Sequence, residues 1–182
     1  MNNMSDKGWS VIVWGICLLT FVGCSSSANK TLSAFYNSRI EFPDLFECRI
    51  LAKDTTITSD KLQQKSLLII YHDSSSCSSC AVRNMFLWDD LLDSLPVTPI
   101  FVFAPSYKDL TKLKKELIIH PSTHLIWIDS QHSFRKINPT IPSESRYHCF
   151  LLDSNRKVKL IGDPRYNQQL FELYKNVLSR SL

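Results

Sequence analysis

The stretch Lys65-Ser-Leu-Leu-Ile-Ile-Tyr-His-Asp-Ser-Ser-Ser-Cys-Ser-Ser-Cys80 decides the fold of this chain. Residues 67–71 form a short apolar run, which is typical of a strand that is covered on both faces. A polar turn follows at 72–76. Apolar residues at helical spacing then predict a helix from about Cys77 to Leu95 with one face in the core. The pattern therefore places a cysteine pair where a buried strand gives way to a helix.

Further elements are predicted on both sides of this stretch. Apolar runs predict strands at 45–51, 55–58, 99–104, 125–129, 148–152 and 158–161. An amphipathic helix is expected from Tyr107 to about Ile119 with Ser106 as its N-cap, and a last helix is expected after Asp163 and Pro164. The resulting order, β-β-β-α-β-α-β-β-β-α, indicates an α/β fold with helices on the faces of a central sheet.

The first residues have the pattern of an export signal. A polar stretch ending in Lys7 precedes an apolar run from Trp9 to Val22, which is too short to span a bilayer comfortably but has the length of a signal-peptide core. The run ends in Phe21-Val-Gly-Cys24, which resembles the lipobox of bacterial lipoproteins. That resemblance implies that residues 1–23 are removed and that Cys24 receives a lipid. The alternatives are an uncleaved signal anchor and ordinary secretion.

Export and lipidation would set the organisation of the mature chain. Residues 24–40 are polar and aperiodic, which predicts a lipidated N-terminus with a flexible tether, and the folded domain is expected at 41–182. The domain would then lie in the cell envelope, attached to a membrane and facing the periplasm or another extracytoplasmic space.

Six cysteines are present, of which Cys17 lies in the leader and Cys24 would be acylated. The remaining four are Cys48, Cys77, Cys80 and Cys149. In an oxidising compartment an even set suggests disulfides, but four cysteines allow three pairings and the sequence does not choose among them.

Several function classes are excluded by composition. The net charge of +4 is not concentrated in a Lys/Arg block, so no nucleic-acid partner is expected. Gly162 is the single glycine after the leader, which excludes glycine-rich phosphate-binding loops. No Gly-x-Ser-x-Gly elbow is present, so the serines at 74–76 are better interpreted as turn residues than as part of a hydrolase triad.

The position of the Cys-Ser-Ser-Cys motif suggests thiol chemistry. At the N-terminus of a helix the first backbone N–H groups lack partners and the helix dipole is positive, so a thiolate on Cys77 would be stabilised. Cys80 lies one helical turn further on, and we expect it to be more buried. Cys77 is therefore the predicted nucleophile, and Cys80 is placed to attack a mixed disulfide and release the partner.

With this motif in this context, the chain resembles the thioredoxin-like superfamily, especially the TlpA/ResA-type membrane-tethered thiol–disulfide proteins and related lipoproteins of Bacteroides-type bacteria. The resemblance runs from about Phe42 to the C-terminus and includes Phe150-Leu-Leu-Asp153 with the closing hairpin and helix. It implies a three-layer α/β/α sandwich with a mixed central sheet and an N-terminal strand or hairpin extension. It also implies disulfide exchange with exported protein thiols, a redox partner protein and no cofactor.

The sequence departs from this family at three positions. Tyr147 stands where the family has a cis-proline, and a trans peptide is expected before it. Ser76 replaces the tryptophan that precedes the first cysteine, and Tyr71 replaces a buried acidic residue. Asp73 and His72 are the nearest substitutes for that acid, or they are solvated turn groups.

Other interpretations remain open at this point. The fold could be a binding or structural module whose cysteines do not turn over, and Cys77 and Cys80 could form a structural disulfide or an idle pair. Cys149 could be a third redox thiol or an inert buried cysteine, and a bridge from Cys48 to Cys149 is a further pairing.

A metal site is the last alternative, with Cys77 and Cys80 joined by His148 or Cys149. A second closely spaced ligand pair is missing from the sequence, so no metal is expected. His120 and His124 are separated by the helix-breaking Pro121 and are predicted to lie on the surface.

Overall fold

A computed structural model describes residues 23–50, 53–62 and 65–180 of the chain. The chain divides into two units between Ala34 and Phe35. The described part of the first unit is helix α2 (Gly23–Phe35), whose last residue is the first of the second unit; the sequence predicts an aperiodic tether here. The predicted export signal lies outside the described residues except for Gly23. Within the described ranges, no helix is both long enough and apolar enough to cross a membrane.

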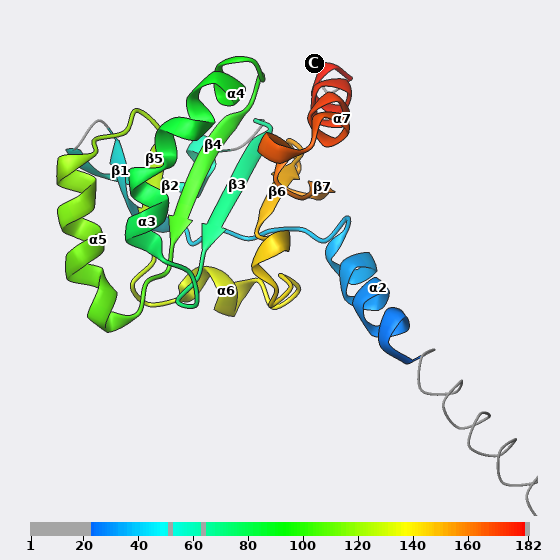
Figure 1. The fold of residues 1–182 in the computed structure, drawn as a ribbon, viewed down its shortest axis with the longest axis horizontal. Coiled ribbons are helices and arrows are strands. Elements are labelled where there is room, and N and C mark those ends of the chain that lie inside the picture. The colour runs from blue at the N-terminus through cyan, green and yellow to red at the C-terminus, as the bar shows by residue number, and fades with distance from the viewer. Residues whose placement is uncertain (1–22, 51–52, 63–64, 181–182) are drawn as a thin grey trace, which may run out of the picture. The chain divides into compact units, whose positions relative to one another are not determined.

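In the second unit, the described strands form one mixed sheet, ordered β2-β1-β5-β4-β3-β6-β7 (Figure 1). Their bounds are β1 Leu45–Ile50, β2 Lys53–Thr58, β3 Leu67–His72, β4 Thr98–Phe103, β5 Leu125–Ile128, β6 Cys149–Leu152 and β7 Val158–Ile161. Strands β3, β4 and β5 are parallel, and the other neighbouring pairs are antiparallel. The carboxyl ends of β3 and β4 therefore share one edge of the sheet with the start of β6, the lower edge in Figure 1.

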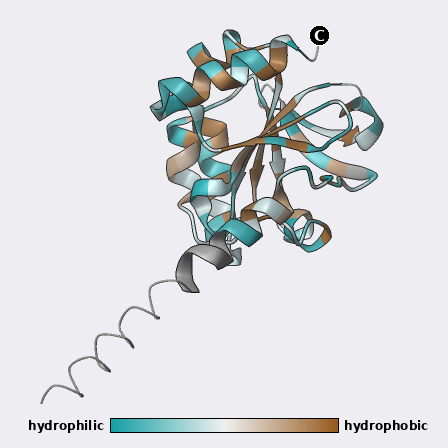
Figure 2. Cartoon of the chain, turned by 90° about the vertical axis from the view of Figure 1, so that its right-hand side faces the viewer, coloured by the Kyte–Doolittle hydropathy of each residue, from teal (hydrophilic) through white to brown (hydrophobic). Residues whose placement is uncertain are grey.

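Helices cover one face of this sheet. They are α3 (Ser78–Arg83), α4 (Asp89–Asp93), α5 (Tyr107–Ile119) and α7 (Gln168–Ser179). Each contributes buried apolar side chains to one cluster with the sheet residues Leu68, Ile70, Phe101 and Phe103. Figure 2 shows the hydrophobic residues concentrated along the central strands. Burial of this apolar surface is the main force that holds the helices in place.

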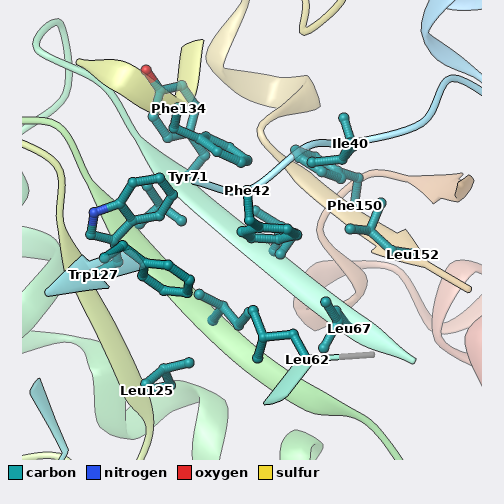
Figure 3. Close-up of a cluster of buried hydrophobic side chains, with 14 of the residues drawn as sticks. Ile40, Phe42, Leu62, Leu67, Tyr71, Leu125, Trp127, Phe134, Phe150 and Leu152 are labelled. Atoms are coloured by element: carbon teal, nitrogen blue, oxygen red, sulfur yellow. The ribbon is translucent and has the colours of Figure 1, made fainter. Parts of the chain in front are cut away.

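The opposite face is covered by the short helix α6 (Ser133–Ile137) and by the chain that leads into β1. The ring of Phe134 on α6 lies 5.9 Å from that of Phe42 and 5.5 Å from that of Tyr71 (Figure 3). The ring of Phe46 lies 4.9 Å from that of Trp127. One of these contacts is edge-to-face and two are tilted, and none is a face-to-face sandwich, which aromatic rings disfavour. They form the second core cluster.

The folded unit begins at Phe35 rather than at Glu41, the boundary expected from sequence. Phe35 and Ile40 are fully buried. The N–H groups of Asn37 and Ile40 donate to the carbonyls of Val158 and Arg156, both at 2.9 Å. Residues 35–40 are thus bonded to the edge of β7 and are part of the domain.

Most predicted elements match the structure to within one or two residues, but three helices differ. The expected helix from Cys77 to Leu95 is three short pieces: α3, a 3₁₀ turn at Met85–Trp88, and α4. After β7, Asp163 caps only the 3₁₀ turn Pro164–Tyr166, and Asn167 caps α7 by accepting from the Leu170 N–H. Helix α6 is not predicted from the sequence.

Candidate thiol–disulfide site

The turn after β3 is held by its own side chains. Asp73 accepts hydrogen bonds from the Ser75 N–H at 3.0 Å and from the Ser75 hydroxyl at 2.6 Å. The Ser76 hydroxyl donates to the Asp73 carbonyl at 2.8 Å. This is the local side-chain bonding that Asp and Ser offer in turns. It ends the strand at the sheet edge and directs the chain into α3.

Cys77 and Cys80 form a disulfide at the start of α3, with their Cα atoms 5.2 Å apart. Cys77 is exposed and Cys80 is half-buried, so Cys80 is the more buried of the two, as the sequence predicts. Cys77 is the N-cap of α3, and its Sγ accepts the Cys80 N–H at 3.3 Å. The Ser79 hydroxyl lies 3.6 Å from the same sulfur. Two local donors can therefore stabilise a thiolate at Cys77.

The stabilisation of Cys77 is more local than the sequence suggests. Helix α3 has only six residues, so its aligned peptide dipoles are few. The contacts that the structure gives Cys77 are local ones, from the Cys80 N–H and the Ser79 hydroxyl. The position of the motif at the beginning of a helix is confirmed. The long helix expected from Cys77 to Leu95, which would have given a larger dipole, is not formed.

Arg83 is a site residue that sequence reasoning missed. Its Nη2 lies 3.9 Å from the Cys80 Sγ, and its Nε lies 3.9 Å from a carboxylate oxygen of Glu116 on α5. Glu116 also lies 3.6 Å from the Nε2 atom of His120. The sequence signal was the spacing of Arg83 three residues after Cys80, which puts both on one face of a helix.

A cavity of about 310 Å³ lies next to this cluster. It is lined by Val82, Arg83, Met85, Phe86, Asp89, Ile119, His120, Pro121, Ser122 and Thr123. A separate cavity of about 330 Å³ lies between the β1–β2 hairpin and α5 and contains no residue of the cysteine turn. The thiol in the lining of that second cavity, Cys48, is buried and its pKa is raised, so we place the candidate site at the disulfide.

Tyr71 stands where the resemblance described above implies a buried acidic residue, and its phenol is neutral at neutral pH. Its side chain is buried between the ring of Phe134 at 5.5 Å (Figure 3) and the ring of His148 at 4.9 Å. Burial, together with the negative charge of Asp73, raises the pKa of Tyr71 to about 12. At neutral pH the phenol therefore does not replace a carboxylate as a proton acceptor.

The two suggested substitutes for that acid differ in state. His72 is half-buried and stacks on Phe103, with ring centroids 5.0 Å apart. Burial, reinforced by the positive charge of Arg165, lowers the pKa of His72 to about 4. Burial alone would raise the pKa of Asp73, but the two hydrogen bonds from Ser75 outweigh it and the pKa is below its ordinary value. Asp73 is thus an ionised turn residue, and His72 is a neutral residue at the end of β3.

The loop before β6 has no proline next to Tyr147, and no peptide bond among the described residues is cis. The expected trans geometry at Tyr147 is confirmed. Tyr147 is half-buried in a 3₁₀ turn (Ser145–Tyr147), with the Arg146 guanidinium 4.6 Å from its ring centre. His148 is buried and its Nε2 lies 2.9 Å from the Pro142 carbonyl. Burial lowers the pKa of His148, and this hydrogen bond opposes the shift only in part.

Cys48 and Cys149 are free, buried thiols. Three strands separate β1 from β6, a spacing of roughly 19 Å at 4.8 Å per strand, whereas a disulfide needs Cα atoms within about 7 Å. The Cys48–Cys149 bridge is therefore excluded. Burial raises the pKa of Cys48 to about 12 and raises that of Cys149 still further. The burial of Cys149 and its raised pKa favour the interpretation as a buried core cysteine over that as a third redox thiol.

The described residues contain no group of three or more His, Cys, Asp or Glu side chains arranged to hold a metal ion. The two histidines with ligand-like spacing have other partners. His124 lies 2.9 Å from a carboxylate oxygen of Asp89 and stacks on Phe101, so it is less exposed than predicted. His120, at the end of α5, is on the surface as expected.

No family model matches the sequence, and no curated protein matches it. The fold is nevertheless similar to solved structures. Thioredoxin peroxidase I from Plasmodium yoelii aligns with a TM-score of 0.56 at 12% identity, over 80% of this chain and 91% of that chain. A cysteine-to-serine mutant of PrxQ from Xylella fastidiosa gives 0.54 at 11% identity, over 78% and 96%. A 2-Cys peroxiredoxin from Plasmodium vivax gives 0.52 at 10% identity, over 80% and 98%.

These structural neighbours are peroxiredoxins of the thioredoxin-like superfamily. At such low identity the likeness concerns the fold. It confirms the predicted thioredoxin-like α/β architecture with a mixed sheet and helices. The TlpA/ResA subtype stays a prediction.

Proposed function

We propose that this chain is a thiol–disulfide oxidoreductase that exchanges disulfides with exported protein thiols through Cys77 and Cys80. The observation that carries the proposal is the Cys77–Cys80 disulfide at the exposed start of α3, on a thioredoxin-like fold. The reaction needs a redox partner protein, and its chemistry requires no cofactor.

The exposure of the two sulfurs sets the order of the steps. In the oxidising direction a partner thiolate attacks the exposed Cys77 Sγ, the Cys77–Cys80 bond breaks, and Cys80 leaves as a thiolate. A second partner thiolate then attacks the partner's sulfur in the mixed disulfide and releases Cys77 as a thiolate. The two electrons pass to the cysteine pair and the partner is oxidised. In the reducing direction the same steps run backwards, with Cys77 as nucleophile and Cys80 as resolving residue.

Active-site variants of the full chain, purified in detergent, test this proposal. Wild type should accelerate insulin reduction by dithiothreitol, and Cys77→Ser should lose at least about 90% of that activity because the buried thiols of Cys48 and Cys149 cannot replace it. Cys80→Ser should accumulate mixed disulfides through Cys77, which non-reducing gels detect. Cys149→Ser is the matched control and should keep the activity. Equal activity of wild type and Cys77→Ser would instead indicate a binding or structural module without turnover.

The cellular setting is part of the proposal and rests on the sequence pattern. The lipobox-like Phe21-Val-Gly-Cys24 supports a lipid anchor on Cys24 that holds the domain outside the cytoplasmic membrane. Metabolic labelling with a palmitate analogue should mark wild type and not Cys24→Ala, and Cys24→Ala should leave the membrane fraction or accumulate as the uncleaved precursor. Equal labelling of the two proteins would contradict the anchor while leaving the disulfide chemistry intact.

A further inference from the structure

A cation lies next to the less exposed sulfur of the disulfide. The Arg83 side chain is half exposed, and its Nη2 is 3.9 Å from the Cys80 Sγ. Arg83 follows Cys80 by one helical turn of α3, so the helix itself brings the two side chains to one face. Cys77, by contrast, receives its contacts from a backbone N–H and a hydroxyl group.

The second helix of this cluster restricts the cation. The Glu116 carboxylate on α5 lies 3.9 Å from the Arg83 Nε, and its side chain is only 16% exposed. The guanidinium thus extends between a carboxylate on one helix and a sulfur on the other. A planar group fixed at two points loses less freedom when it contacts the sulfur than a free side chain would.

Arg83 acts differently on the two redox states. The disulfide is neutral, so a nearby positive charge contributes little to its stability. The reduced pair carries a thiolate at neutral pH when its thiol pKa is low, and a cation at this distance favours that anion. Stabilising the reduced form makes a disulfide easier to reduce, so the pair becomes a stronger oxidant.

We propose that Arg83 is a positioning residue that shifts the redox equilibrium of the Cys77–Cys80 pair toward the reduced form by stabilising the negative charge that the reduced Cys80 shares with Cys77. This inference rests on the proposed function and adds to it the direction in which the pair is biased. In exchange with glutathione, two glutathione thiols give two electrons and become one glutathione disulfide. The Cys77–Cys80 bond breaks, the reduced pair takes one proton, and the other proton goes to solvent, so that the pair holds one negative charge, which is favoured by the donors at Cys77 and by Arg83 at Cys80.

The same contact affects the rate of the first step. A thiol with a lower pKa is a better leaving group in thiol–disulfide exchange. When a partner attacks Cys77, Cys80 is the leaving group, and Arg83 is the cation beside it. Arg83 therefore favours both the reduction of this disulfide and the speed with which it opens.

The test is the equilibrium of the full chain with glutathione buffers, measured by acid quench, alkylation and mass spectrometry. Arg83→Gln should shift the equilibrium constant toward the disulfide by roughly three- to tenfold, the size expected for a half-exposed cation, where tenfold corresponds to about 30 mV. Thiolate absorbance at 240 nm should show a higher pKa for the reduced pair in Arg83→Gln. Arg83→Lys should restore part of both effects, which a purely structural role would not produce.

Lys112→Gln is the matched control, because it removes the same charge from an exposed position on α5. It should leave the equilibrium constant within about twofold. An unchanged constant in Arg83→Gln, or an equal shift in Lys112→Gln, would overturn the inference. If the constant shifts as expected but the protein transfers no electrons to or from protein thiols, the proposed function fails while the role of Arg83 stands. If the protein does transfer electrons but the equilibrium constant of Arg83→Gln is unchanged, the proposed function stands and the role of Arg83 fails.

Discussion

The cysteine turn, residues 73–80, and the end of the sheet beneath it have opposite effects on the charge of their ionisable groups. On the turn, Cys77 is exposed and its sulfur accepts a backbone N–H, and hydrogen bonds from Ser75 outweigh burial to lower the pKa of Asp73. Both environments favour the charged form of the group.

Beneath the turn, burial favours the neutral form of every group whose pKa shifts. It raises the pKa values of Tyr71 and Cys149 and lowers those of His72 and His148. This difference divides the site into a turn that would carry the thiolate chemistry and a neutral support, the uncharged residues below it. Four experiments test that division, in order of decreasing expected effect.

The largest expected difference is in thiol reactivity. After mild reduction, Cys77 should react with iodoacetamide at pH 7.5 at least about a thousandfold faster than Cys48 or Cys149, because the buried thiols have raised pKa values and lack solvent access. Peptide mass spectrometry at timed intervals measures the three rates in one sample. A denatured sample is the control, in which all three should react alike. Comparable alkylation rates for Cys77 and Cys149 in the native protein would show that the turn and the buried strand do not differ in thiol reactivity.

The next effect concerns acid stability. The pKa of His72 is about 4 in the folded protein against an ordinary 6.5, so the unfolded chain binds the proton more tightly. The unfolding free energy is therefore unaffected by His72 above pH 6.5. As the pH falls through 6.5 and then 4, proton uptake by the unfolded chain lowers the unfolding free energy by up to about 3 kcal/mol. His72→Gln should therefore show a shallower loss of unfolding free energy between pH 6.5 and 4 than wild type. Urea titrations at several pH values measure both slopes, and identical slopes would show that His72 is not held neutral by the fold.

A third experiment separates stability from activity. Cys149→Ser places a hydroxyl group in a fully apolar strand and should lower the unfolding free energy by about 1–2 kcal/mol without changing exchange activity. Cys77→Ser should leave the unfolding free energy nearly unchanged, since the residue is exposed, and should abolish exchange activity. Both are measured in reductant so that the disulfide does not contribute. Trp88 and Trp127 are buried and report unfolding by fluorescence. A stable Cys149→Ser variant with impaired exchange would make Cys149 a redox participant.

The sequence predicted the central strands because burial on both faces leaves an uninterrupted apolar run. Residues 67–71 and 99–104 have that pattern, and they form β3 and β4 in the middle of the sheet. Helix α5 was predicted at its observed bounds because one face repeats apolar residues over three turns.

Short elements escaped prediction for a physical reason. Helix α6 has five residues, too few to show a period, and it is fixed by the Asp129 carboxylate, which accepts the N–H groups of Ser133 and Phe134 at 2.8 Å. Phe35 and Ile40 lie in a segment without a regular apolar period, so no pattern indicates that they enter the core. Along the expected 77–95 helix the apolar spacing continues through the break at Asn84, because the 3₁₀ turn and α4 bury the same side as α3.

The site was predictable to the extent that it is local in sequence. The exposure of Cys77, the partial burial of Cys80 and the trans peptide at Tyr147 all follow from short-range rules. The Arg83–Glu116 pair needed the packing of α3 against α5, which sequence spacing does not reveal.

The smallest expected effect concerns Tyr71, which stands where the thioredoxin-like family has a buried acid. Because its pKa is about 12, the phenol is neutral throughout the working range and cannot accept the Cys80 proton at pH 7. Tyr71→Phe keeps the ring contacts with Phe134 and His148 and should change the insulin-reduction rate by less than about twofold. A loss of tenfold or more, with an altered pH profile and unchanged stability, would place proton transfer beneath the turn. The neutral support would then be part of the chemistry, and solvent would no longer suffice as the proton acceptor for Cys80.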